Sequence, residues 1–147
     1  MQVKFRVIPE RDEPAVVIEV PAVTEQAEEL AAYIRAWTPS LLTLWNGDAA
    51  LRVPPAVILR FYAEDKGVSA QTADGIFTVR QRLYELEQQL DPRAFVRISH
   101  SEIVNLRQVT ALDLSLSGTI KMTLSGGAAV SYASRRYVKK LKQALNL

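Results

Sequence analysis

The sequence predicts a mainly β fold of the α+β class, built from many strands with a few short helices. Three observations predict it: apolar and polar residues alternate through much of the chain, strong turn signals follow one another closely, and helical spacing is confined to short segments. The chain has 147 residues, of which 48% are hydrophobic and 23% charged. These values exclude a second large domain and wholesale disorder.

Residues 1–38 predict a small β-hairpin followed by a helix. Apolar residues alternate over residues 3–7 and 16–20, and residues 9–14 between them have turn chemistry. Thr24 is the expected N-cap of a helix whose apolar face consists of Leu30, Ile34 and Trp37. A hairpin and one helix bury little surface, so we expect this segment to pack on the rest of the chain or on another chain.

From residue 41 onward, short strands and tight turns alternate. Strands are expected at residues 41–45, 57–63 and 68–72, followed by turns at Asn46-Gly47-Asp48, Asp65-Lys66-Gly67 and Asp74-Gly75. In the second of these strands, we expect one face to carry Val57, Leu59 and Phe61.

Residues 81–147 are expected to add two helices and three further strands. A helix over residues 81–90 has an apolar stripe of Leu83, Leu86 and Leu90. Alternation predicts strands at residues 95–98, 110–116 and 119–124. The last helix begins at Ser134 as N-cap, with Tyr137, Leu141 and Leu145 facing inward and Arg135, Lys139 and Lys142 facing outward.

The charge of the chain is asymmetric. Residues 1–94 hold 10 Lys and Arg against 14 Asp and Glu, whereas residues 95–147 hold 8 against 2. A basic half attracts polyanions such as nucleic acid, although a solvated basic surface without a partner has the same composition.

The residue inventory argues against an enzyme and against metal or cofactor chemistry. Cysteine is absent and His100 is the single histidine, which excludes thiol nucleophiles and most zinc sites. Adjacent residues of an extended segment point to alternating sides, so residues 99–102 (Ser-His-Ser-Glu) do not form a catalytic triad. No apolar run reaches the ~18 residues of a membrane span, and the N-terminus does not resemble a signal peptide, so we expect a cytoplasmic protein.

Two polar segments could contact nucleic acid. Ser99, His100 and Ser101 follow a strand and are expected to form an exposed turn, where small donors and acceptors suit either base edges or local backbone groups. Arg135 and Arg136 stand at a helix N-terminus, an unfavourable place for cations unless an anion such as phosphate compensates them.

These segments carry a family resemblance. Residues 95–105 (FVRISHSEIVN) and 132–140 (YASRRYVKK) resemble the two motifs of the LytTR family of bacterial DNA-binding domains. Residues 58–67 (ILRFYAEDKG), Asp74-Gly75 and Gly126-Gly127 fall in the family's order and spacing, so the resemblance covers residues 41–147. It implies an elongated, multi-stranded domain that regulates transcription by binding double-stranded DNA, with loops in successive major grooves of paired sites.

The resemblance also assigns roles to residues. It implies base contacts by His100 and Arg136, and Arg135 fits either a base or a phosphate contact. Ser101 and Asn105 are expected to be structural. The expected phosphate contacts, for each of which a solvated surface position is the alternative, are Lys66, Ser69, Arg97, Ser99, Lys121, Ser134, Lys139 and Lys140. At the position of Val68, some family members carry a polar or basic residue that reads a base. The loop here is therefore expected either to contact phosphate only, through Lys66 and Ser69, or to contact a thymine methyl group through Val68.

The role of residues 1–38 in oligomerisation is not decided by their sequence. Many family members carry a receiver domain before the DNA-binding part, but residues 1–38 do not resemble one. Since two modules usually bind paired sites, we expect a homodimer in solution or on DNA, joined through this segment unless it packs in cis. The alternative function is a protein-interaction module or antagonist that acts through residues 1–38, with a membrane-bound inhibitor protein as partner.

Overall fold

A computed structural model describes residues 1–11, 15–36, 41–127 and 130–147 of the chain. The chain divides into two units, residues 1–38 (unit 1) and residues 39–147 (unit 2). No helix among the described residues is long and apolar enough to cross a membrane.

Unit 1 contains the expected helix but not the expected hairpin. Helix α1 spans Glu25–Ala36, and the Thr24 hydroxyl caps it by accepting a hydrogen bond from the amide of Ala27 at 3.2 Å. The described residues before α1 form no strand, and Phe5 is 98% exposed. The hairpin prediction was wrong because alternation alone cannot hold two strands together that bury nothing.

The apolar stripe of α1 is half-buried. It consists of residues three and four positions apart, namely Ala27, Leu30, Ala31 and Ile34. Trp37, the third residue of the expected face, lies outside the described residues.

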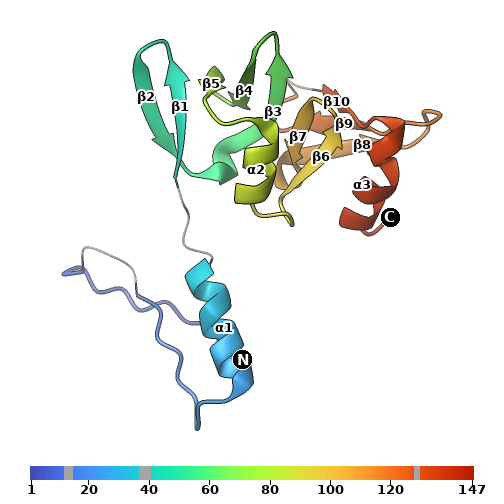
Figure 1. Ribbon diagram of the computed structural model, residues 1–147. Coiled ribbons are helices and arrows are strands. Elements are labelled where there is room, and N and C mark those ends of the chain that lie inside the picture. The colour runs from blue at the N-terminus through green and yellow to red at the C-terminus, as the bar shows by residue number, and fades with distance from the viewer. Residues whose placement is uncertain (12–14, 37–40, 128–129) are drawn as a thin grey trace. The chain divides into compact units, whose positions relative to one another are not determined.

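Unit 2 is built from two antiparallel sheets (Figure 1). The larger has the strand order β2-β1-β5-β4-β3-β7-β6, and the smaller has the order β10-β9-β8. The strands of the larger sheet are β1 Leu42–Asn46, β2 Ala49–Val53, β3 Ile58–Glu64, β4 Gly67–Thr72, β5 Gly75–Val79, β6 Phe95–Ser99 and β7 Glu102–Asn105. The strands of the smaller sheet are β8 Val109–Asp113, β9 Lys121–Leu124 and β10 Val130–Tyr132.

Short helical segments connect and cover the sheets. The α-helices of unit 2 are α2 Leu83–Gln89 and α3 Val138–Ala144, and the 3₁₀ turns are η1 Pro55–Val57, η2 Leu106–Gln108 and η3 Arg135–Tyr137. The side chains predicted to form the apolar stripe of α2, Leu83, Leu86 and Leu90, are all buried. Fold class and helix periodicity are therefore confirmed for this unit.

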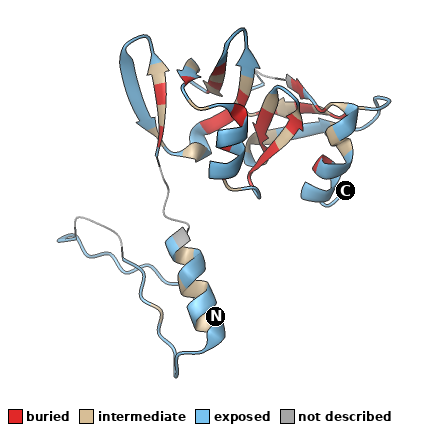
Figure 2. Ribbon diagram, in the orientation of Figure 1, coloured by how far each residue is buried: buried red, intermediate tan, exposed pale blue. Residues whose placement is uncertain are grey.

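Two apolar clusters form the core, and both contain a helix residue (Figure 2). In the first, Leu86 of α2 joins Phe61 and Phe95, whose ring centroids lie 5.9 Å apart. In the second, Leu141 of α3 joins residues of both sheets, including Ile98 and Met122.

Strand β3 contributes to both clusters, and this corrects one expectation. Ile58 and Phe61 lie in the first cluster, Leu59 lies in the second, and Val57 belongs to η1. The register shifts between Ile58 and Arg60, so the side chains do not simply alternate along this strand. Val57, Leu59 and Phe61 therefore do not share a face.

Candidate nucleic-acid interface

Three turns that carry predicted contact residues lie at the same end of the larger sheet. Strand β3 ends beside the start of β7, where Tyr62 pairs with Glu102 and the amide of Ala63 donates to the carbonyl of Ser101 at 2.8 Å. The β3–β4 turn is therefore next to the β6–β7 turn. The third turn, η3, is joined to the end of β6 by a 2.8 Å hydrogen bond from the Ser134 amide to the Ile98 carbonyl.

His100 occupies the tip of the β6–β7 turn. Ser99 pairs with Glu102, so His100 and Ser101 form a two-residue turn, and both are exposed. The Ser99 hydroxyl accepts a hydrogen bond from the Ser101 amide at 3.2 Å and lies 3.4 Å from the Ser101 hydroxyl. The two serine side chains thus bond within the turn, whereas the imidazole of His100 is presented outward.

Arg97, on β6, stabilises this turn through hydrogen bonds to its backbone carbonyls. Its guanidinium donates to the Ser99 carbonyl at 2.8 Å, to the His100 carbonyl, and to a carboxylate oxygen of Glu87 at 3.0 Å. Its side chain is only 13% exposed. An arginine engaged in this way has few donors left for phosphate, which makes it a positioning residue for the turn.

Glu87 links two of the predicted phosphate-binding residues. Its second carboxylate oxygen lies 3.9 Å from Nζ of Lys140 on α3. Because Lys140 and Glu87 are both substantially exposed, this ion pair is weak and the lysine can exchange it for another anion.

Arg135 and Arg136 are exposed on η3. Ser134 does not cap the segment through its side chain, contrary to expectation, and it accepts through its backbone carbonyl from the Tyr137 amide at 2.8 Å. The first turn is a 3₁₀ turn because this i to i+3 bond closes it.

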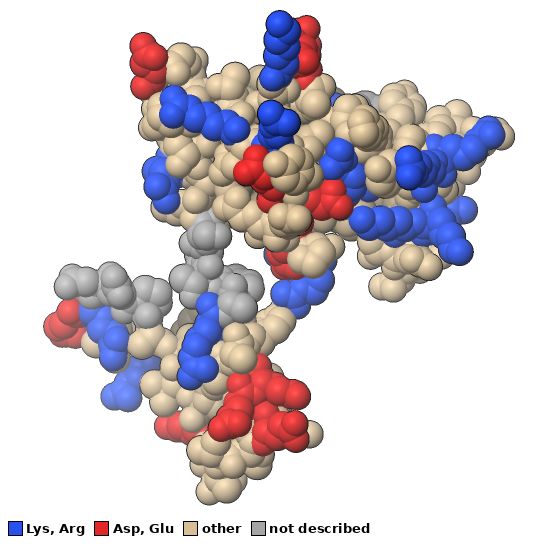
Figure 3. Space-filling view, viewed as in Figure 1, with Lys and Arg blue, Asp and Glu red and all other residues tan. Residues whose placement is uncertain are grey.

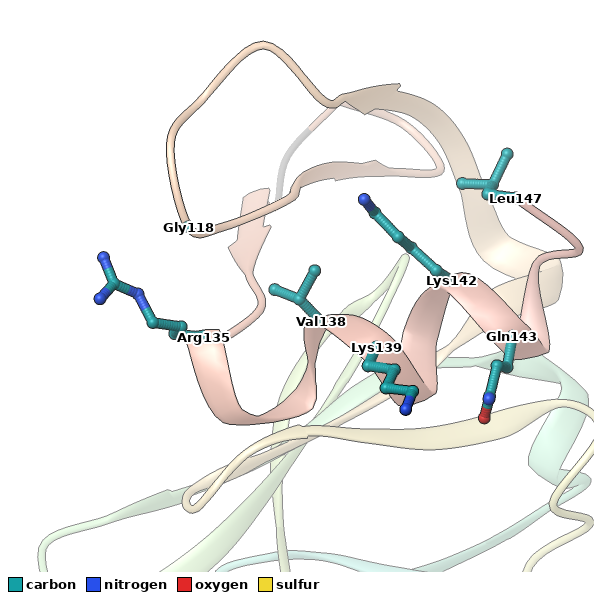
Figure 4. A pocket seen from close by; sticks show the side chains of 7 residues that line it. All are labelled: Gly118, Arg135, Val138, Lys139, Lys142, Gln143 and Leu147. Carbon is teal, nitrogen blue, oxygen red and sulfur yellow. The ribbon is translucent and has the colours of Figure 1, made fainter.

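A shallow basic groove lies between η3, α3 and the loop after β8. Its volume is about 500 Å³, and its cationic lining residues are Arg135, Lys139 and Lys142 (Figure 4). A side-chain Cβ at Gly118 would stand 2.9 Å from the Arg135 guanidinium, so the loop backbone approaches this arginine closely. Lys142, expected only on the outer face of the helix, belongs to this cationic set.

Lys66 and Ser69 lie in and just after the β3–β4 turn. Lys66 is exposed, and the turn before it is made by Asp65 with a left-handed φ of 53°, which Asp tolerates in turns. Ser69 is half-buried opposite Tyr62. Val68 is buried in the first core cluster, so the expectation that it meets a thymine methyl group was wrong.

The smaller sheet adds Lys121 and an exposed tyrosine, Tyr132. Lys121 pairs across the sheet with Tyr132 on one side and with Asp113 on the other. Hydrogen bonds from Ser115 hold the pKa of Asp113 below its usual value, and the charge of Lys121 lowers it further. Tyr132, three residues before Arg135 in the chain, is 53% exposed.

Asn105 lies at the other end of the β6–β7 hairpin, inside unit 2. Its amide nitrogen donates to the Ile58 carbonyl at 2.9 Å, and its amide oxygen accepts from the Arg107 backbone at 3.1 Å. The side chain is buried and ties β7 to the start of β3.

The positive charge of unit 2 is concentrated in its C-terminal part, residues 95–147. Blue Lys and Arg side chains gather over α3 and the elements beside it (Figure 3). Among the described residues, no group of three or more His, Cys, Asp or Glu is arranged to hold a metal ion.

The comparisons with known proteins agree with this geometry. The family model of the LytTr DNA-binding domain matches residues 48–146. The chain belongs to the LytTR family. The family is one of DNA-binding domains, and the match includes both motifs that the Ser134–Ile98 bond brings together.

The chain is also similar in sequence to curated relatives and in fold to a solved structure. Two uncharacterized HTH-type transcriptional regulators of Staphylococcus aureus, from strains NCTC 8325 and MRSA252, are 43% and 42% identical over 90 residues. The match covers 61% of this chain and 60% of each relative. The LytTr domain of a Bacillus cereus protein described as a methyl-accepting/DNA response regulator has a TM-score of 0.69 at 23% identity, over 74% of this chain and 98% of that chain. At this identity the structural match shows the LytTR fold.

Proposed function

We propose that this LytTR protein binds double-stranded DNA sequence-specifically and regulates transcription. One observation carries the proposal: the Ser134–Ile98 hydrogen bond joins the β6–β7 turn to η3, so that His100, Arg135 and Arg136 stand exposed on adjacent turns. Side chains on turns reach into a major groove as those on a helix do, provided the strands beneath hold them rigidly.

Different residues serve base and backbone contacts in this proposal. Arg136 and His100 contact base edges, and Arg135 contacts a base or a phosphate. The phosphate contacts come from exposed or half-exposed groups around these turns, namely Lys66, Ser69, Lys121, Ser134, Lys139, Lys140 and Lys142. Arg97 and Ser99 position the β6–β7 turn, because their polar groups bond within it.

The experiment compares selected and random DNA. Binding sites are selected from a random duplex library with the full chain, and affinities are measured by fluorescence anisotropy. Arg136→Ala should lose about 1 to 3 kcal/mol on the selected site and less on random duplex. Arg52→Ala is the matched control, because Arg52 is exposed on β2 at the opposite edge of the sheet. Failure of the library to yield any preferred sequence would refute sequence-specific binding.

We further propose that the protein binds paired sites as a homodimer joined through residues 1–38. The support is the apolar surface that unit 1 leaves uncovered, which includes Val3, Phe5 and Val7. Sedimentation of the full chain and of residues 41–147, with and without paired-site DNA, tests this. Equal cooperativity of the two proteins on paired sites would remove the segment from dimerisation and favour a role in binding another protein.

A further inference from the structure

We propose that Glu102 is a positioning residue whose carboxylate fixes the three DNA-facing turns relative to one another. The proposal rests on the proposed function for its effect on DNA. The hydrogen bonds of Glu102 to Arg60 and Ser131, which join the strands, can be tested in the protein without DNA.

The Glu102 carboxylate joins two sheets. One of its oxygens accepts hydrogen bonds from the Arg60 guanidinium, at 3.0 Å, and from the hydroxyl of Ser131. Arg60 lies on β3 and Glu102 on β7 of the larger sheet, whereas Ser131 lies on β10 of the smaller sheet. Arg60 also donates to the side-chain oxygen of Gln71 on β4 at 2.8 Å, so four strands share one polar network.

The register explains why these side chains meet. Arg60 pairs with Val104 and Tyr62 pairs with Glu102, so Arg60 and Glu102 are diagonal neighbours on one face of the β3–β7 pair. Arg60 stands directly opposite Gln71 on the other side. The pairing therefore places the guanidinium between two acceptors.

Burial makes the network sensitive to charge. Ser131 is 2% exposed, and the side chains of Arg60 and Glu102 are 22% and 14% exposed. A charged group held largely away from water costs free energy unless its partners remain in place. The network therefore favours a single arrangement of the strands that it joins.

Glu102, Ser131 and Arg60 each lead to or follow one of the three turns. Glu102 directly follows the His100-Ser101 turn, and Ser131 precedes Ser134 by three residues. Arg60 lies on the strand that leads to the turn at Lys66. A base contact by two of these turns requires a fixed separation between them, and a shift of about 1 Å is enough to lose it.

The test is Glu102→Gln in the full chain, with Glu64→Gln as the matched control. The control removes the same charge from an exposed position near the β3–β4 turn. Glu102→Gln should weaken binding to a selected site about tenfold, affect random duplex less, and leave the salt slope unchanged. Glu64→Gln should strengthen both DNAs slightly. Equal losses on both DNAs, or a gain like that of the control, would overturn the proposal.

A second measurement uses the free protein. In Glu102→Gln, and independently in Ser131→Ala, amide hydrogen exchange at Ala133 and Ser134 should accelerate beyond any change shared by the core amides. The double variant should be no faster than the faster single variant. Unchanged exchange in both single variants would overturn the proposal even if the wild type binds DNA, and accelerated exchange in a protein that binds no DNA would refute the proposed function alone.

Discussion

Replacing Arg97 by methionine separates two roles for this residue, phosphate contact and support of the β6–β7 turn. Methionine keeps most of the aliphatic stem but removes the three hydrogen bonds to Ser99, His100 and Glu87. Each bond to a charged group contributes at most about 1.5 to 3 kcal/mol, but the turn carbonyls regain water and the Glu87 pair is partly exposed. We expect a loss of about 2 kcal/mol of unfolding free energy, which lowers the Tm by roughly 10 °C.

The assay combines urea unfolding with DNA binding over a range of salt concentrations. Arg97→Met should weaken binding to a selected site because His100 is no longer held, while the slope of log affinity against log salt stays that of the wild type. Lys139→Ala, on the exposed face of α3, serves as the comparison and should lower the slope by about one. A slope that falls by one in Arg97→Met, without loss of stability, would refute the positioning role.

Three further predictions concern other groups of unit 2. Glu87→Gln should raise the affinity for random DNA at low salt, because it frees Lys140 from its carboxylate, and should raise the affinity for a selected site less, because Arg97 loses its charged partner; unchanged affinity for random DNA in a binding titration would contradict this. Asn105→Ala should cost about 2 to 3 kcal/mol of stability in urea unfolding, since it leaves the Ile58 carbonyl buried without its donor, and a loss below about 0.5 kcal/mol would be inconsistent with that reasoning. Burial raises the pKa of Asp91, but hydrogen bonds from Arg93 and the charges of Arg93 and Arg107 outweigh it and lower the pKa. Asp91→Asn should therefore be less stable than the wild type at neutral pH, and the difference should vanish as the pH falls through the folded pKa, which thermal melts between pH 7 and pH 2 would show.

The periodicity of the sequence predicted those elements that bury one face against the core. Leu83, Leu86 and Leu90 repeat at helical spacing, and all three are buried along or just after α2. The strands expected at residues 41–45, 68–72 and 95–98 also form, because alternation there coincides with strong turn signals. Residue periodicity and turn residues were sufficient to predict an element wherever that element buries one of its own faces.

Elements defined by their neighbours were not predictable in this way. Strands β7 and β10 have 4 and 3 residues, too few for a periodic signal, and each forms only by pairing with a longer strand. The strand expected at residues 110–116 ends at Asp113, whose carboxylate accepts a 2.9 Å hydrogen bond from the Ser115 amide and so starts a turn. The alternation of apolar and polar residues continues to residue 116, but the hydrogen bond of the Asp113 side chain ends the strand before that point.

The candidate interface was predictable in composition but not in its internal bonds. His100 and the arginines at 135 and 136 could be proposed from their motifs, and all three are exposed. The sequence could not show that Arg97 faces Glu87, because the two lie ten residues apart on a helix and a strand. Competition between an internal carboxylate and a phosphate for the same arginine depends on tertiary structure alone.

The bond between Ser134 and Ile98 has a consequence for synthesis of the protein. Strands β1 to β7 can pair through contacts within residues 42–105, so the larger sheet can begin to form while the rest of the chain is still in the ribosome. Ser134 follows Ile98 by 36 residues, so the turn that carries Arg135 and Arg136 can bond to the end of β6 only after those residues have left the ribosome. A nascent chain therefore presents His100 before it can present its arginine partners, and a truncated product that retains only the larger sheet would lack Arg135 and Arg136.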